Sequence, residues 1–398
     1  MDTSNRRIFL RKAAVGTVTV TAQLAAAGLV PRRIFAEGSP EFSRVVYRML
    51  GSTGFKTSEV GFGCMNMRDP ELVHAAIDSG INYIDTAWYY MNGQNEEVVG
   101  RVMKTKRDKV FLVTKTGLNK NPADVPKEIE TSLKRLQTDH VDLLLFHKVV
   151  TREEMFDETF MKLYDDARKK GYTRFIGISI HGTQAELLDA AVDSKFWEAV
   201  LTGYNYFSPP EQTAAIRRAR EAGLAIIGMK NLITTARPRR PFPDTRKDKD
   251  AKTTNQQALL KWVLDDPYVD TIIPGVTSFE QLADNLAIMG MKLSFDERRR
   301  LQRFGERTRG FYCAGVAGCT GCLGGCPKGV EIRELNRCVN YADGYGDIAL
   351  ARENYRELPR STRVDVCGDC GECGECVVKC VNGLDLTHTV QRAKELFA

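Results

Sequence analysis

Three apolar, strand-like runs in this sequence each end in an ionisable side chain, and a tyrosine follows the first of them. The runs cover residues 81–84, 110–114 and 141–146. They are followed by Asp85, Lys115 and His147, and Tyr90 lies five residues after Asp85. Charged groups at the ends of buried strands are seldom packing residues. If the strands are parallel members of one barrel, their carboxyl ends meet at one mouth, and these four residues form the candidate catalytic group.

The elements that would position this group recur along the chain. Strand signals alternate with amphipathic helical runs over about 250 residues, the length and rhythm of a (β/α)8 TIM barrel. They fall at residues 59–63, 81–85, 110–115, 141–147, 174–180, 199–205, 224–229 and 269–275. A doubly wound sheet is expected to carry a Gly-x-Gly-x-x-Gly turn after an early strand, and the sequence has none. We therefore predict an α/β fold with a TIM barrel over residues 46–305.

The same segments resemble a known enzyme family. Asp85-Thr86-Ala87 with Tyr90, and the runs that end in Lys115 and His147, are similar in order and spacing to the segments that carry the Asp, Tyr, Lys and His tetrad of aldo-keto reductases. The resemblance covers roughly residues 46–300. It implies a barrel enzyme that interconverts a small-molecule carbonyl and an alcohol, with a nicotinamide dinucleotide over the barrel mouth.

The chemistry of carbonyl reduction gives each tetrad residue a role. A hydride must reach carbon and a proton must reach oxygen, so we expect Tyr90 to act as the general acid, with a pKa brought down toward neutrality. Lys115 would favour its phenolate, and Asp85 would hold Lys115 in place. His147 would orient the carbonyl oxygen by a hydrogen bond. Singly, each residue is more simply explained as a packed aromatic, a satisfied histidine or a structural ion pair; together they favour a catalytic site.

The resemblance also implies residues that hold NAD(P). Ser179 matches a serine that meets the carboxamide, while the segments around residues 273–285 match those that hold the adenosine end. The expected cofactor-binding residues are Ser179, Gly275, Gln281 and Asn285.

Other positions depart from the family pattern. Ile180, Leu201 and Met229 stand where the family has Asn, Gln and a tyrosine that stacks on the nicotinamide. Gly275 and Gln281 replace the Lys and Arg that often hold the 2′-phosphate, which removes charge-assisted contacts specific to NADP. We expect a weak or absent preference for NADP, and impaired binding of the nicotinamide itself stays an open alternative.

Ten of the eleven cysteines lie after residue 312, in a predicted ferredoxin-like domain over residues 311–398. The C-x2-C-x2-C-x3-C spacing of the last run is that of a bacterial ferredoxin, and an upstream run ends in Cys-Pro. In such domains the last cysteine of each run ligates the other cluster. This predicts two [4Fe-4S] clusters, one on Cys313, Cys319, Cys322 and Cys380, the other on Cys370, Cys373, Cys376 and Cys326. Cys367 could replace a neighbour, and Cys338 has no assigned role.

Other uses of these cysteines stay open. Structural zinc or a single cluster fits the number of thiols. A disulfide framework fits an exported protein, although thiols separated by two residues cannot bridge locally without strain.

The N-terminus resembles a twin-arginine export signal. Arg6 and Arg7 precede Ile8-Phe9-Leu10 and an apolar stretch, which predicts a signal over residues 1–36 and a periplasmic or otherwise exported protein. Ile34 is a poor residue near the expected cut, so membrane attachment through an uncleaved signal is the alternative. This route carries folded, cofactor-loaded proteins, which agrees with an iron-sulfur domain.

Composition narrows the class of partners. The formal net charge of +6 is concentrated in the first 36 residues, and the remainder of the chain is almost neutral. Nucleic acid is therefore not an expected partner.

Two functional hypotheses follow. The first is an exported oxidoreductase with electrons exchanged through a nicotinamide or through the clusters, which would involve a redox partner protein; the sequence carries no flavin signal to join the two routes. The second is a non-catalytic electron-transfer or scaffold protein whose barrel binds a partner or ligand.

Overall fold

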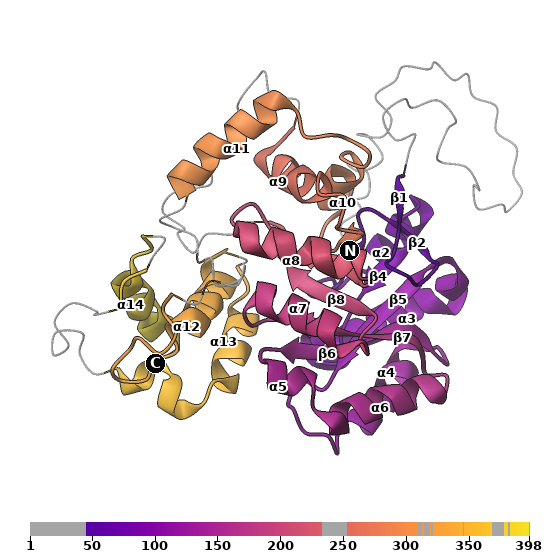
Figure 1. Ribbon diagram of the computed structural model, residues 1–398, viewed down its shortest axis with the longest axis horizontal. Coiled ribbons are helices and arrows are strands. Elements are labelled where there is room, and N and C mark those ends of the chain that lie inside the picture. Colours follow the sequence, from indigo (N-terminus) through magenta and orange to yellow (C-terminus); the bar gives the residue numbers. More distant parts are fainter. Residues whose placement is uncertain are drawn as a thin grey trace, which may run out of the picture.

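The computed structural model describes residues 45–232, 253–308, 313, 319, 321–344, 346–367, 378–380 and 383–397 (Figure 1). The predicted export signal over residues 1–36 lies outside these ranges. So do Cys370, Cys373 and Cys376, three predicted ligands of the second cluster. These assignments stay predictions.

Eight parallel strands form one closed sheet in sequence order. They are β3 (Phe62–Gly63), β4 (Tyr83–Asp85), β5 (Phe111–Thr116), β6 (Val141–Val149), β7 (Thr173–Ile180), β8 (Ala199–Gly203), β9 (Ala225–Met229) and β10 (Thr271–Ile272). The first and last strands join through Gly61 N, which donates to Ile272 O at 2.7 Å, and Gly63 N, which donates to Pro274 O at 3.1 Å. The predicted TIM barrel is confirmed.

Helices surround this sheet (Figure 1). They are α2 (Pro70–Asp78), α3 (Gln94–Lys106), α4 (Val125–Leu136), α5 (Arg152–Met155), α6 (Glu158–Lys169), α7 (Gln184–Ser194), α8 (Pro210–Glu221), α9 (Asn255–Leu264), α10 (Phe279–Leu286) and α11 (Phe295–Thr308). The antiparallel hairpin of β1 (Tyr47–Met49) and β2 (Lys56–Ser58) carries Leu50 and Phe55 in its turn, and both pack against the barrel interior. None of the described helices is long and apolar enough to cross a membrane.

The alternation of side chains along the strands decides which groups face the barrel axis. Tyr83 of β4, Phe111 and Val113 of β5, and Leu143 and Leu145 of β6 belong to one buried interior cluster. Successive side chains of a strand point to opposite faces, so every second residue faces inward. Counting two positions on from Tyr83, Val113 and Leu145 gives the next inward-facing residue of each strand. That rule places Asp85, Lys115 and His147 inside the barrel at its carboxyl end.

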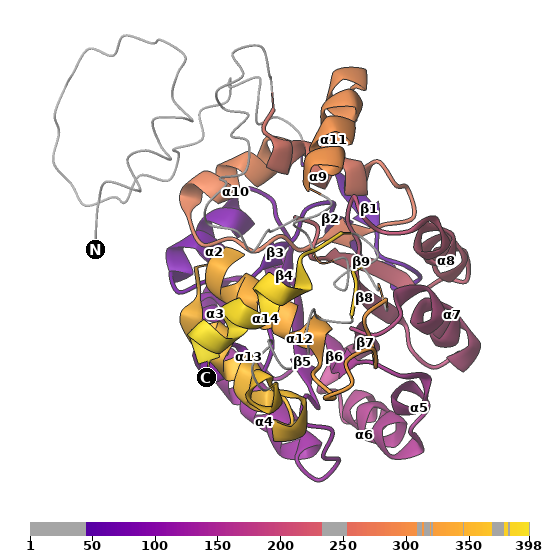
Figure 2. The same ribbon diagram turned by 90° about the vertical axis from the view of Figure 1, so that its left-hand side faces the viewer.

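The C-terminal residues build a smaller unit with its own apolar core. It contains α12 (Ile332–Val339), the turn η6 (Asn340–Gly344), α13 (Ile348–Glu357), the short turns η7 (Arg360–Thr362) and η8 (Val364–Val366), and α14 (Leu386–Phe397). Leu335, Cys338 and Val390 are among its buried residues. In both views this unit lies against one end of the barrel, and Figure 2 shows α12 and α13 in front of the strands. The C-terminal unit therefore lies over the catalytic end of the barrel.

Candidate active site

Lys115 is the centre of the site. Its Nζ donates to Asp85 Oδ1 at 2.5 Å, to Thr86 O at 2.7 Å and to the Tyr90 hydroxyl at 3.3 Å. The side chains of Lys115 and Asp85 are only 1% and 2% exposed. Burial raises the pKa of Asp85, and the charge of Lys115 opposes that rise. Lys115 thus contacts both the acid and the tyrosine.

A strained turn places Tyr90 above Lys115. Tyr90 opens the 3-10 turn η1 (Tyr90–Gly93), in which Met91 and Asn92 both adopt a φ of 54°. Gly93 follows with a φ of 88°, and a Cβ added there would lie 2.2 Å from the guanidinium carbon of Arg135. Left-handed backbone at non-glycine residues costs free energy and is concentrated at functional sites. The geometry therefore holds the tyrosine in one position.

His147 completes the tetrad from the neighbouring strand. Its ring centroid lies 6.1 Å from that of Tyr90, in an edge-on arrangement. The side chain is buried, and its Nδ1 has no hydrogen-bond partner among the described residues. Burial, and then the charge of Lys115, hold the pKa of His147 well below its usual value. The imidazole is therefore neutral and can donate one hydrogen bond to a bound carbonyl oxygen.

The protonation of Tyr90 differs from the sequence-based expectation. Its pKa is raised well above the usual value, first by burial and then by the charge of Asp85, rather than brought down toward neutrality. The main reason is that burial of the phenol disfavours its charged form, and the negative charge of Asp85 adds to this effect. Tyr90 therefore holds its proton, as a proton donor must before the reaction.

The predicted cofactor residues fall into two places. Ser179 is the penultimate residue of β7, and its buried Oγ has no hydrogen-bond partner among the described residues. Gly275, Gln281 and Asn285 lie together on the loop after β10 and on α10. The Gln281 Oε1 accepts hydrogen bonds from the backbone N of Thr277 at 2.7 Å and from its hydroxyl at 3.1 Å. Gln281 therefore stabilises its own loop.

Four further polar residues surround the mouth, and the sequence reasoning did not single them out. They are Lys148, His181, Lys230 and Arg337. The first three directly follow His147, Ile180 and Met229 at strand ends, so the strand-end rule could have found them. Arg337 comes from α12 of the C-terminal unit, and no sequence signal links it to the barrel.

Three of the predicted cluster ligands in the C-terminal unit lie near one another. Burial raises the pKa of Cys322, and the charges of Cys319 and Cys380 raise it further, so these three thiols from both predicted runs lie near one another. In the part of the chain that the structure describes, no three His, Cys, Asp or Glu side chains are placed to hold a metal ion. Cys338 is buried in the apolar core of the C-terminal unit, which accounts for it without a metal.

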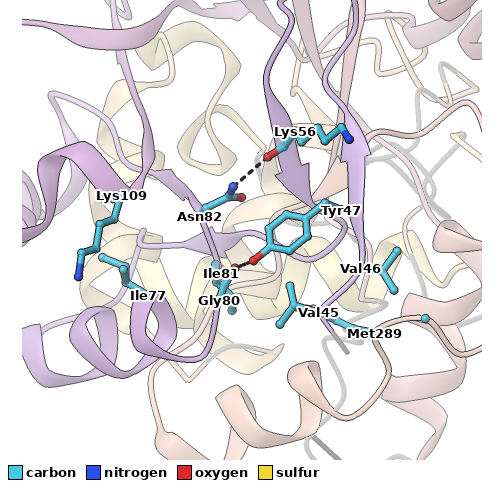
Figure 3. A pocket seen from close by; sticks show the side chains of 11 residues that line it. Val45, Val46, Tyr47, Lys56, Ile77, Gly80, Ile81, Asn82, Lys109 and Met289 are labelled. Atoms are coloured by element: carbon cyan, nitrogen blue, oxygen red, sulfur yellow. Dashed lines mark hydrogen bonds between the residues drawn. The ribbon is translucent and has the colours of Figure 1, made fainter. Parts of the chain in front are cut away.

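A hollow of about 920 Å3 lies at the opposite end of the barrel (Figure 3). Gly80, Ile81 and Asn82, directly before β4, contribute to its lining, as does Lys109 before β5. Tyr47 OH donates to Gly80 O at 2.9 Å beside it. Active sites of TIM barrels lie at the carboxyl end of the strands, so this amino-terminal hollow is not the catalytic mouth.

Comparison with known proteins covers the barrel. The sequence profile of the Aldo/keto reductase family matches residues 59–306. YhdN of Bacillus subtilis, described as an aldo-keto reductase, is 28% identical over 318 residues, which cover 66% of this chain and 94% of YhdN. Methylglyoxal reductase DkgB of Escherichia coli O157:H7 is 27% identical over 250 residues, which cover 61% of this chain and 90% of DkgB.

Solved structures agree with the fold. The holo form of aldo-keto reductase AKR11C1 from Bacillus halodurans superposes with a TM-score of 0.56 at 23% identity, over 66% of this chain and 96% of that protein. An aldo/keto reductase from Klebsiella pneumoniae, solved with NADP and acetate, gives a TM-score of 0.55 at 25% identity, over 64% of this chain and 94% of that protein. The family profile ends at residue 306, before the cysteine-rich segment.

Proposed function

The chain belongs to the aldo/keto reductase family, a family of NAD(P)H-dependent oxidoreductases, and on this premise we propose that it interconverts small carbonyl compounds and alcohols at Tyr90. One observation carries the proposal: a single buried ammonium, Lys115 Nζ, contacts both Asp85 and the Tyr90 hydroxyl beside a neutral His147. A structural ion pair would not require the tyrosine or the histidine.

Each residue of the site has a defined part in the reduction. A bound NAD(P)H would supply the hydride to the carbonyl carbon. Tyr90 gives its proton to the carbonyl oxygen as negative charge develops there, and Lys115, 3.3 Å away, stabilises the phenolate that remains. His147 donates a hydrogen bond that fixes the carbonyl oxygen beside Tyr90. Asp85 keeps Lys115 in place, and the tyrosine regains its proton from solvent after the alcohol leaves.

A pair of neighbouring tyrosines supplies the test. Tyr90→Phe removes the proton donor, whereas Tyr89→Phe makes the same chemical change one residue away on the same loop. We expect reduction of methylglyoxal by the Tyr90→Phe protein to fall by about 10²–10⁴-fold. The Tyr89→Phe protein should retain the wild-type rate. Equal activity of the two variants would contradict the assignment of Tyr90.

For the cofactor, we propose that NADH serves about as well as NADPH. The buried Ser179 Oγ without a partner suits a carboxamide, and a Cβ added at Gly275 would meet no atom within 4 Å, so a dinucleotide can approach there. Neither Gly275 nor Gln281 supplies a cation for a 2′-phosphate. Titration of protein fluorescence with NADH and with NADPH gives the two dissociation constants. A complex with NADPH that is more than a hundredfold tighter would refute the proposed lack of preference.

For the C-terminal unit, we propose two [4Fe-4S] clusters that carry electrons to or from a redox partner protein. The nearness of Cys319, Cys322 and Cys380, which come from the two predicted runs, supports the exchange of ligands between runs. Iron, acid-labile sulfide and an EPR spectrum of the reduced protein, all measured without oxygen, provide the test. Zinc, or the absence of any metal, would contradict it.

We also propose export through the twin-arginine route, on the strength of Arg6 and Arg7 before an apolar stretch. A variant with Arg6→Lys and Arg7→Lys should stay inside the cell, and cell fractionation would detect this. Export of that variant at the wild-type level would rule the signal out.

The non-catalytic alternative makes the opposite prediction at the active site. A scaffold or electron-transfer protein would lose its function in a Cys373→Ser variant and keep it in a Tyr90→Phe variant.

A further inference from the structure

The mouth of the barrel carries two lysines that the tetrad does not use. Lys148 follows His147 in β6 at a shift in the strand register, and Lys230 directly follows β9. Both adopt left-handed backbone, with φ of 58° and 56°. A bulge or a left-handed residue at a strand end redirects a side chain, and such strain persists where the surrounding structure maintains it. A position inside β6 and the residue after β9 thus each carry an ammonium at the carboxyl end of the barrel, on strands that β7 and β8 separate.

Neither lysine forms an ion pair with a described residue, although Glu334 acts electrostatically on both. The Nζ of Lys230 lies 3.4 Å from Nδ1 of His181, which is itself a base. Burial lowers the pKa of both lysines, and that of Lys230 falls to about 7. Half-buried ammonium groups that form no ion pair are costly, and a bound anion would offset that cost.

The C-terminal unit adds more positive charge from the other side. Arg337 on α12 acts electrostatically on Lys148, on Lys230 and on His181. It is held by Glu334, 2.7 Å away, and by Asn354 at 2.5 Å. Four cations lie near one another here: Lys148, Lys230, Arg333 and Arg337. Two acids, Glu334 and Glu357, lie near them. The cations that act on one another between the barrel mouth and α12 therefore outnumber the acids.

This positive space adjoins the reaction centre. The ring of His181 lies 6.3 Å from that of His147, and His147 lies 6.1 Å from Tyr90. Lys148 is the next residue in the chain after His147. A small molecule whose carbonyl oxygen contacts Tyr90 and His147 would therefore extend a second group toward the two lysines.

We propose that the substrate of this site is a small carbonyl compound that also bears a carboxylate, which Lys148 and Lys230 bind. The proposal rests on the proposed carbonyl chemistry at Tyr90. Arg337 closes the anion site from the C-terminal unit, and this explains why that unit lies over the mouth. A dinucleotide phosphate carries the same kind of charge, so the experiment must separate it from a substrate carboxylate.

Two probes of equal carbon number isolate the carboxylate. The purified full-length protein is assayed with 4-oxobutanoate, which is anionic, and with butanal, which is neutral. Because a charge-assisted hydrogen bond contributes about 1.5–3 kcal/mol, Lys148→Met and Lys230→Met should each raise KM for 4-oxobutanoate by about tenfold or more. KM for butanal and kcat for both compounds should change less than about twofold.

Matched variants exclude a general loss of structure. Lys230→Arg keeps the charge and should retain most of the affinity for 4-oxobutanoate. Lys109→Met makes the same change as the test variants at the opposite end of the barrel, where the lysine is exposed, and should match the wild type. Equal losses with both aldehydes, or a loss with Lys109→Met, would overturn the proposal.

Two binding measurements complete the test without turnover. Calorimetry with succinate should show binding that Lys148→Met and Lys230→Met abolish. Fluorescence titration with NADPH should give the same dissociation constant for all variants. If the lysine variants weaken NADPH and leave 4-oxobutanoate unaffected, the cations serve the dinucleotide and the proposal is wrong. If succinate binds as expected but neither aldehyde is reduced, the anion site stands and the proposed carbonyl chemistry fails.

Discussion

Replacement of Lys115 by methionine should damage folding as well as catalysis. The change removes the ammonium that contacts Asp85 at 2.5 Å, in a pair whose side chains are 1% and 2% exposed. Asp85 Oδ2 already has no hydrogen-bond partner among the described residues, so the variant leaves the carboxylate buried without compensation. Breaking such a pair from one side costs about 3–5 kcal/mol of unfolding free energy. Solvent screening does not reduce this value, because both groups are buried.

The loss of unfolding free energy in Lys115→Met should grow as the pH rises. Burial raises the pKa of Asp85 above its usual value, and Lys115 opposes that rise, so the pKa rises further in the variant. A folded-state pKa above the unfolded value means that stability falls as pH rises through the folded-state pKa. Urea unfolding should therefore show a larger loss at about pH 8 than at about pH 5.

A second substitution distinguishes folding from chemistry. Adding Asp85→Asn to Lys115→Met removes the uncompensated charge, so the double variant should regain most of the stability and none of the turnover. If Lys115→Met is within about 1 kcal/mol of the wild type at high pH, the buried-pair reasoning is refuted.

Three further results are expected. His147→Gln should lower kcat/KM for carbonyl reduction by about 10²–10³-fold, because one donor to the developing oxyanion is lost; a change below about tenfold would contradict that role. KM for 4-oxobutanoate should rise as pH increases through about 7, where Lys230 loses its proton, and KM for butanal should stay constant; parallel profiles would refute the charge argument. The charged and titratable groups that act on or contact Lys230 are His181, Lys148, Arg333, Glu334 and Arg337. Cys322→Ser should lower the iron content of the full-length protein, which colorimetry measures. Cys64→Ser changes a buried barrel cysteine and should leave the iron content unchanged. Equal iron in both variants would contradict the assignment of Cys322 as a ligand.

The fold was predictable because its signals are local. Six of the strand runs contain the observed strands almost throughout, since the interior and the helix-facing side both select apolar side chains. The first and last runs were predicted too long: β3 and β10 have two residues each, and Val60 and Gly63 join Ile272 and Gly275 as isolated bridges. Closure between segments about 210 residues apart leaves no local pattern that marks where pairing stops.

The site was predictable in its barrel part only. Asp85, Lys115 and His147 follow from side-chain alternation at strand ends, and Tyr90 from its place in the following loop. The pKa of Tyr90 was predicted in the wrong direction, because burial depends on what covers the mouth. The approach of Arg337 to the mouth depends on how two separately folded units dock, which residue spacing does not encode.

The most direct test of the account follows the hydride itself. Carbonyl reduction with NADPH deuterated on the transferred face of C4 should give an alcohol with deuterium on the carbinol carbon, as mass spectrometry detects. The Tyr90→Phe protein should form this product at least about 10²-fold more slowly. An alcohol without deuterium would mean that electrons arrive by another route, and an unchanged rate in the variant would mean that Tyr90 is not the proton donor.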